Sequence, residues 1–121
     1  MGNTMINGWR DMGFDTVPLT SGDNTPPARE YLVLEPQGDG DRIVGFEVPD
    51  EGANWIFEVS NGDPAQTLNM DLIAGSFGQS PPEILLPPGF SKVRIPPGMA
   101  QRIAYIAGRG FFPLFAGTLV V

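Results

Sequence analysis

Short apolar runs alternate with clusters of glycine, proline, asparagine and aspartate from residue 31 to the end of the sequence. The runs recur at intervals of about 8–12 residues, a spacing typical of an all-β sandwich or barrel. We therefore expect an antiparallel two-sheet sandwich, jelly-roll-like, with seven or eight strands. The predicted strands are residues 31–35, 42–48, 54–60, 67–74, 83–86, 90–95, 100–107 and 113–121.

Two of these runs alternate strictly between apolar and polar side chains. The apolar positions are Trp55, Phe57 and Val59 in the first run, and Leu68, Met70, Leu72 and Ala74 in the second. Successive side chains of a strand point to opposite faces, so each apolar set is expected to face the core. The last run is apolar on both faces, which predicts either a central strand or a strand covered by another subunit.

Residues 1–30 differ from the rest of the chain. They mix Gly, Asn, Asp and Thr with isolated apolar residues and end in Thr25-Pro26-Pro27, which favours an extended backbone. We predict an extended N-terminal arm over residues 1–30 and a β-sandwich domain over residues 31–121. Two interpretations of the arm stay open: a mobile terminus, or an arm that docks on a neighbouring subunit through Trp9 and Phe14.

The charge is divided unevenly along the chain. All 14 acidic side chains lie in residues 1–83, which contain three arginines, so this part carries 3 − 14 = −11. Residues 84–121 carry four basic side chains and no acidic one, so 4 − 11 gives the total of −7. This total disfavours nucleic acid as the main partner, because binding to phosphates needs a basic face. The basic residues of the second part are Lys92, Arg94, Arg102 and Arg109.

A Pro-Pro-Gly turn at residues 96–98 predicts a basic cluster. If these residues form a three-residue hairpin loop, Lys92, Arg94 and Arg102 gather on the outer face of one sheet. Like charges facing each other across strands are unfavourable, so such a face would attract an acidic cover. The acid-rich part of a neighbouring subunit could supply it. The alternative is a basic face exposed to solvent.

Three aromatic residues crowd the segment after Gly110, namely Phe111, Phe112 and Phe115. A strand buries alternate residues, so it cannot bury all three. We expect either core and loop packing or an exposed apolar patch used in assembly.

The chain contains neither cysteine nor histidine, which removes thiol chemistry, the commonest general base and the commonest transition-metal ligand. Asp39 and Asp41 flank Gly40 and could bind calcium, but acidic turns are also common as hairpin tips. The serines have no histidine to activate them. We therefore expect no enzyme, no cofactor and no metal. No apolar run reaches 18 residues and no leader pattern opens the sequence, so neither a membrane span nor a secretory signal is expected.

The arm, the β domain, the Pro-Pro-Gly turns and the absence of cysteine and histidine together resemble the small β-rich virion proteins of tailed phages, particularly head decoration or cement proteins. The resemblance implies a virion protein, assembled in the host cytoplasm, that forms homo-oligomers, often trimers, and stabilises the capsid by binding the major capsid protein on its outer surface. The interface residues we expect are Trp9, Phe14, Lys92, Arg94, Arg102, Arg109, Phe111 and Phe112. The alternatives are a virion tail or fibre module and a carbohydrate-binding β-sandwich module. The latter would need Trp55 and Tyr105 to face solvent, whereas the alternation places both inside.

Overall fold

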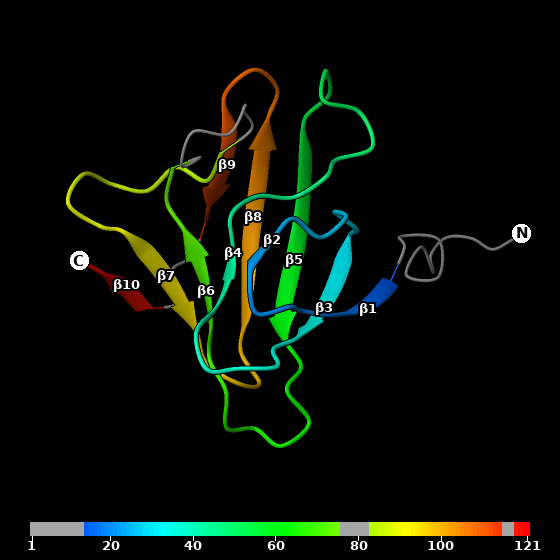
Figure 1. Ribbon diagram of the computed structural model, residues 1–121. Coiled ribbons are helices and arrows are strands. Elements are labelled where there is room, and N and C mark those ends of the chain that lie inside the picture. The colour runs from blue at the N-terminus through cyan, green and yellow to red at the C-terminus, as the bar shows by residue number, and fades with distance from the viewer. Residues whose placement is uncertain (1–13, 76–82, 115–117) are drawn as a thin grey trace, which may run out of the picture.

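The computed structural model describes residues 14–75, 83–114 and 118–121, which contain ten strands and no helix (Figure 1). The strands are β1 (Phe14–Pro18), β2 (Asp23–Asn24), β3 (Tyr31–Glu35), β4 (Asp41–Ile43), β5 (Trp55–Asn61), β6 (Met70–Ile73), β7 (Lys92–Ile95), β8 (Ala100–Ile106), β9 (Gly110–Pro113) and β10 (Thr118–Val120).

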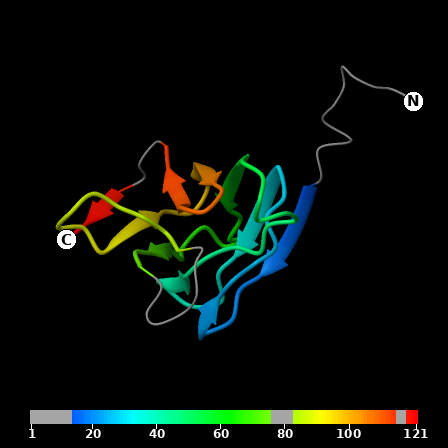
Figure 2. The same cartoon turned by 90° about the horizontal axis from the view of Figure 1, so that it is seen from above.

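The strands form two five-stranded sheets, consistent with the predicted β-sandwich. Sheet A has the order β1-β3-β5-β8-β9 and sheet B the order β10-β7-β6-β4-β2. The view from above separates the two layers (Figure 2). Both sheets are mixed: four of the eight pairings are parallel, so the prediction of an antiparallel sandwich is wrong for half of them, and the jelly roll is not confirmed.

The parallel pairings follow from the path of the chain, which changes sheet after every strand from β1 to β6. Parallel neighbours need a crossover between them, and here the crossover is a strand of the opposite sheet. Thus β1, β3 and β5 run parallel in sheet A, and β2, β4 and β6 run parallel in sheet B. The remaining strands, β7 to β10, pair antiparallel.

The arm predicted for residues 1–30 is not confirmed over its described part. Residues 14–30 supply β1 to sheet A and β2 to sheet B, and Leu19 and Ala28 lie in the core. Residues 1–13, which include Trp9, lie outside the described residues. The segment escaped prediction because β2 has only two residues and β1 contains Asp15, Thr16 and Pro18.

The hairpin predicted around residues 96–98 is wrong. These residues do form a turn, in which the Met99 amide donates to the Pro96 carbonyl at 3.1 Å. However, β7 pairs with β6 and β10 in sheet B, whereas β8 pairs with β5 and β9 in sheet A. The turn therefore passes the chain from one sheet to the other, which its length alone does not reveal.

The core lies between the two sheets and is centred on aromatic rings. Phe46 and Phe57 pack edge to face with a centroid distance of 5.0 Å, and Phe111 lies 5.3 Å from Phe46 and 5.0 Å from Tyr105. Burial of one such ring stabilises the fold by about 1.5–3 kcal/mol. The other large buried apolar side chains are Leu32, Leu34, Ile43, Val59, Met70, Leu72, Ile84, Val93, Ile95 and Ile103.

The β9 edge of sheet A is covered by the segment around Ile84, where a strand over 83–86 was predicted. The Phe111 amide donates to Glu83 and the Leu85 amide donates to Phe111, both at 2.8 Å, although only isolated bridges form. A Cβ atom on Gly110 would collide with the Glu83 carbonyl oxygen, and Gly110 has a φ of 131°. Only glycine fits this close approach of two backbones.

A buried amide joins the two sheets at one end of the sandwich. The Nδ2 of Asn61 donates to the carbonyls of Leu68 and Ile95, both at 2.9 Å, and its Oδ1 accepts the amide of Asp63 at 3.1 Å. Buried polar groups are stable only when their hydrogen bonds are satisfied. Asn61 is therefore a structural residue that fixes where β5, β6 and β7 meet.

Candidate functional site

The outer face of sheet A carries a row of apolar side chains, two of which are exposed. Ile56 of β5 lies opposite Ala104 of β8, which in turn lies opposite Phe112 of β9. Ile56 is 62% exposed, Leu114 is 44% exposed and Phe112 is half-buried. We call Ile56, Ala104, Phe112 and Leu114 the apolar row. Charged side chains border it, because Glu58 lies opposite Arg102, two residues along β5 and β8 from Ile56 and Ala104.

Sequence reasoning missed the centre of this row. The alternation that places Trp55 and Phe57 inward also places Ile56 on the outer face, together with Glu58. A large apolar side chain on a polar face is the signal that could have identified it. Its neighbour Ala104 is buried even though the strand alternation directs it outward.

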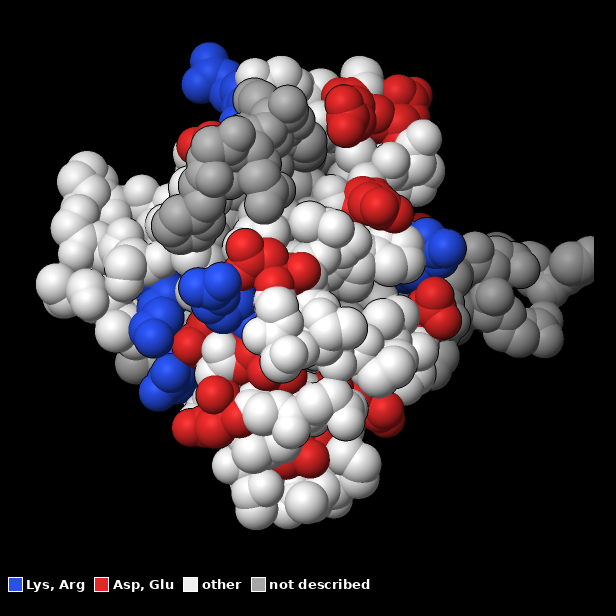
Figure 3. Space-filling model, viewed as in Figure 1, with Lys and Arg blue, Asp and Glu red and all other residues white. Residues whose placement is uncertain are grey.

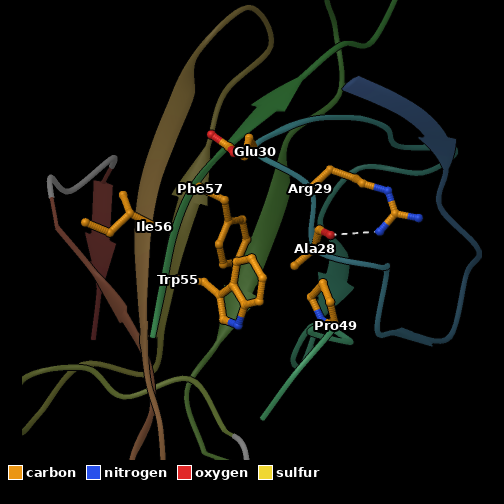
Figure 4. Close-up of a pocket in the computed structure, with 7 residues that line it drawn as sticks. All are labelled: Ala28, Arg29, Glu30, Pro49, Trp55, Ile56 and Phe57. Atoms are coloured by element: carbon orange, nitrogen blue, oxygen red, sulfur yellow. Dashed lines mark hydrogen bonds between the residues drawn. The ribbon is translucent and has the colours of Figure 1, made fainter. Parts of the chain in front are cut away.

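A pocket of about 130 Å³ lies beside the start of β5 (Figure 4). Its lining residues are Ala28, Arg29, Glu30, Pro49, Trp55, Ile56 and Phe57. In the close-up, Trp55 and Phe57 lie on one side of β5, and the side chain of Ile56 points to the other. The indole Nε1 of Trp55 donates to the Asp50 carbonyl at 2.9 Å, which fixes the ring at the pocket wall. The alternation predicts that both Trp55 and Tyr105 lie inside. Tyr105 is buried, whereas Trp55 is only half-buried.

A second, polar hollow adjoins this pocket and shares Glu30, Ile56 and Phe57 with it. It has a volume of about 290 Å³ and is further lined by Tyr31, Glu58 and Arg102. The apolar pocket, the polar hollow and the apolar row therefore meet at Ile56. This region, which we call the β5 site, is the candidate functional site.

The basic cluster predicted on one face does not form. Lys92 and Arg94 belong to sheet B and Arg102 to sheet A, because β7 and β8 lie in different sheets. Arg94 instead binds the carboxylate of Asp71 with two hydrogen bonds of 2.9 and 3.0 Å, and the Lys92 Nζ lies 3.4 Å from the same carboxylate. Hydrogen bonding to Asp71 raises the pKa of the Arg94 guanidinium. The acidic group that we expect from a neighbouring subunit is thus supplied by Asp71 of the same chain.

The Asp71–Arg94 pair is part of a row of alternating charge across the outer face of sheet B. Asp23, Arg42, Asp71 and Arg94 lie opposite one another in that order on four neighbouring strands. Arg42 forms a salt bridge with Asp23 at the exposed end of the row. Figure 3 shows acidic and basic side chains side by side over this part of the molecule.

The other predicted interface residues separate into buried and exposed ones. Phe111 is completely buried in the core, so its prediction as an interface residue is wrong. Phe112 is half-buried in the apolar row, and Arg109 is exposed at the turn between β8 and β9. Trp9 lies outside the described residues; Phe14 opens β1, but its side chain is not among those described.

The acidic loop considered for calcium is tied into the fold. The Asp41 carboxylate accepts the amides of Gln37 and Gly38, at 2.7 and 3.0 Å. Asp39 accepts the amide and the side-chain nitrogen of Asn69, both at 2.9 Å, and these hydrogen bonds lower the pKa of Asp39. Among the described residues, no three His, Cys, Asp or Glu side chains lie close enough together to hold a metal ion. These carboxylates hold the turn together.

The described residues include no helix that could cross a membrane. No family model matches the chain, and neither a curated protein nor a solved structure is significantly similar to it.

Proposed function

We propose that the protein is a non-enzymatic assembly protein that forms a homo-oligomer and binds a larger protein shell, as the capsid decoration proteins it resembles do. The observation that supports this proposal is the apolar row on the outer face of sheet A. Ile56 is the key residue, because it exposes 62% of its surface on a central strand rather than at a chain end or loop tip.

The composition of the β5 site fits a protein interface. Interface centres are apolar and aromatic, and their rims are polar and charged. Here Ile56, Phe112 and Leu114 form the apolar part, while Glu58 and Arg102 border it. Affinity would come from the apolar anchors, and the charged rim would orient the partner.

The alternative functions fit the site less well. A pocket of about 130 Å³ is slightly smaller than an engineered cavity of about 150 Å³ that holds a benzene molecule, so it does not suit a chain of sugar rings. Tyr105, which a carbohydrate-binding face would need, is buried. A tail or fibre module would use the same apolar row, and it differs only in the partner.

Oligomer mass tests the proposal. We expect the full chain to sediment as an oligomer, most simply a trimer, at micromolar concentration. The double variant Ile56→Lys/Leu114→Lys should shift it to a monomer, because two ammonium groups would have to be buried in the interface. Met99→Lys is the matched control, since Met99 is 52% exposed but lies in the turn that precedes β8, away from the apolar row.

Two results would contradict the proposal: a wild-type chain that stays monomeric at high micromolar concentration, or an equal effect of the control variant. Binding to a shell is tested by cosedimentation with assembled capsid shells of tailed phages. The double variant should no longer cosediment, whereas Met99→Lys should do so as wild type does.

A further inference from the structure

Strand β5 extends beyond the start of its parallel neighbour β3. The first residue pair between them is Tyr31 with Glu58, so residues 55–57 of β5 have no strand beside them on this side. On the other side, these residues pair with β8. A short stretch of strand edge therefore lies open within sheet A, next to the β5 site.

The backbone of Ile56 faces this open stretch. The Asn61 amide donates to Met99 at 2.9 Å on the β8 side, and the Glu58 amide donates to Glu30 at 3.0 Å on the β3 side. Because backbone groups alternate in direction along a strand, the N–H and C=O of Ile56 point to the same side as those of Glu58. No described residue forms a hydrogen bond with either group.

The apolar pocket lies directly beside these two groups. Trp55, Pro49 and Ala28 line it, and its volume of about 130 Å³ is suited to one aliphatic or methionine side chain. An extended peptide placed here could exchange two hydrogen bonds with Ile56 and insert one side chain into the pocket. This combination of backbone pairing and a side-chain pocket is the mode of recognition known as strand addition.

The two ends of sheet A do not offer the same opportunity. The β9 edge is covered by the segment around Ile84. On β1, the outward-facing Pro18 has no N–H, and the Thr16 amide is bonded to the Asp15 carboxylate at 3.1 Å. Such features protect edge strands from pairing with other chains. Within the described part of sheet A, the open stretch of β5 is thus best suited to the addition of a strand.

Building on the self-assembly in the proposed function, we propose that the N-terminal segment of a second copy, residues 1–13, adds to β5 beside Ile56. The described chain begins at Phe14, opposite Tyr31, so the segment emerges at the same end of sheet A as the site. Thirteen extended residues span up to about 43 Å, enough to reach a neighbour. The segment contains apolar side chains of suitable size for the pocket: Met5, Ile6 and Met12.

The topology favours the segment of a neighbour over that of the same chain. The connection through Ala28 and Glu30 leads directly into β3, which lies between β1 and β5 in sheet A, and it is hydrogen-bonded to Glu47 and to Glu58. The chain's own segment would have to cross this connection, and connections rarely cross at one end of a sheet. A segment arriving from a second molecule meets no such obstacle.

Paramagnetic broadening between two chains tests the proposal. The full chain with Asn3→Cys carries a single nitroxide label, since the natural chain has no cysteine. It is mixed with the nitrogen-15-labelled wild-type chain, which has no cysteine and therefore carries no spin label. We expect the amide signals of Trp55, Ile56 and Phe57 in the nitrogen-15 chain to lose at least half of their intensity. Ile56→Pro in that chain should abolish the loss, because proline lacks the N–H that faces the segment. Ile56→Val is the matched control and should retain the loss.

Ile56→Pro removes no hydrogen bond to β8, because the Ile56 N–H points away from that strand. The amide spectrum of the Ile56→Pro variant shows whether it is folded. If this variant is unfolded, Met5→Ser/Ile6→Ser in the spin-labelled chain serves as the test and must reduce the loss of signal intensity. The proposal is overturned if the mixed sample shows no broadening, or if broadening occurs only when label and nitrogen-15 are on the same chain. If Ile56→Lys/Leu114→Lys dissociates an oligomer that shows no broadening, this inference alone fails. A monomeric wild-type chain refutes both proposals.

Discussion

The outer faces of the two sheets carry different kinds of side chain. On sheet B, Asp23, Arg42, Asp71 and Arg94 alternate in sign across four strands, and each charge has a partner beside it. On sheet A, the corresponding face exposes Ile56 and Leu114, the two most exposed members of the apolar row. The charges on the outer face of sheet B are paired within the chain, whereas the outer face of sheet A leaves apolar surface exposed to water.

This difference changes the meaning of the uneven charge along the sequence. The acidic first part and the basic second part of the sequence suggest that the chain binds oppositely charged partners. In the folded protein, the parts meet internally: Lys92 and Arg94 contact Asp71, and Arg102 lies opposite Glu58. The charge pattern therefore contributes mainly to the fold, and the apolar row remains as the surface that we propose for assembly.

The largest expected effect concerns the centre of the charged row. Asp71→Ala should lower the free energy of unfolding by about 3 kcal/mol, because it leaves Arg94 and Lys92 half-buried without their carboxylate. Asp23→Ala removes a carboxylate from the exposed end of the same row and should cost less than about 1 kcal/mol. Urea unfolding of both variants measures the difference. Equal losses would show that the row does not depend on burial.

A carboxylate held by backbone amides provides a second contrast, in the loop that connects sheet A to sheet B. Asp63 accepts the amides of Thr67 and Leu68, both at 2.8 Å, and that of Ala65 at 3.2 Å. These hydrogen bonds, chiefly that of Thr67, lower the pKa of Asp63 from its usual 3.8. The carboxylate thus contributes stability that is fully present above pH 3.8 and is lost as the pH falls through the lower pKa of the folded protein.

We therefore expect Asp63→Asn to be less stable than wild type at neutral pH and to approach it in acid. Urea unfolding midpoints between about pH 5 and about pH 2 measure the convergence. Unlike the effect of Asp71→Ala, the effect of Asp63→Asn should change little with salt, since no cation is involved. A gap that persists unchanged into strong acid would contradict this assignment.

The sequence predicts the strands better than their arrangement. The runs at 31–35, 54–60 and 100–107 match β3, β5 and β8 to within one residue, because a period of two is a local property. The sheet to which each strand belongs depends on where the chain crosses the core. A turn such as residues 96–98 is compatible with a hairpin and with a change of sheet, so the predicted basic cluster was wrong.

The candidate site is only partly contained in the local pattern. The outward position of Ile56 follows from the alternation around Trp55 and Phe57. The pocket and the open backbone do not, because they arise where β3 begins relative to β5, a register set by residues far apart in sequence. The burial of Phe111 likewise depends on its contacts with Phe46 and Tyr105 across the core.

The smallest expected effect on stability completes the comparison of the two faces. Ile56→Thr keeps a β-branched side chain suited to a strand, and the side chain it replaces is largely in water. The free energy of unfolding should therefore change by no more than about 0.5 kcal/mol, as is usual for surface substitutions. The same variant should weaken self-association at least tenfold, because Ile56 is the most exposed member of the apolar row. Parallel urea unfolding and sedimentation measurements separate the two effects. A loss of stability without a loss of association would mean that Ile56 supports the fold rather than an interface.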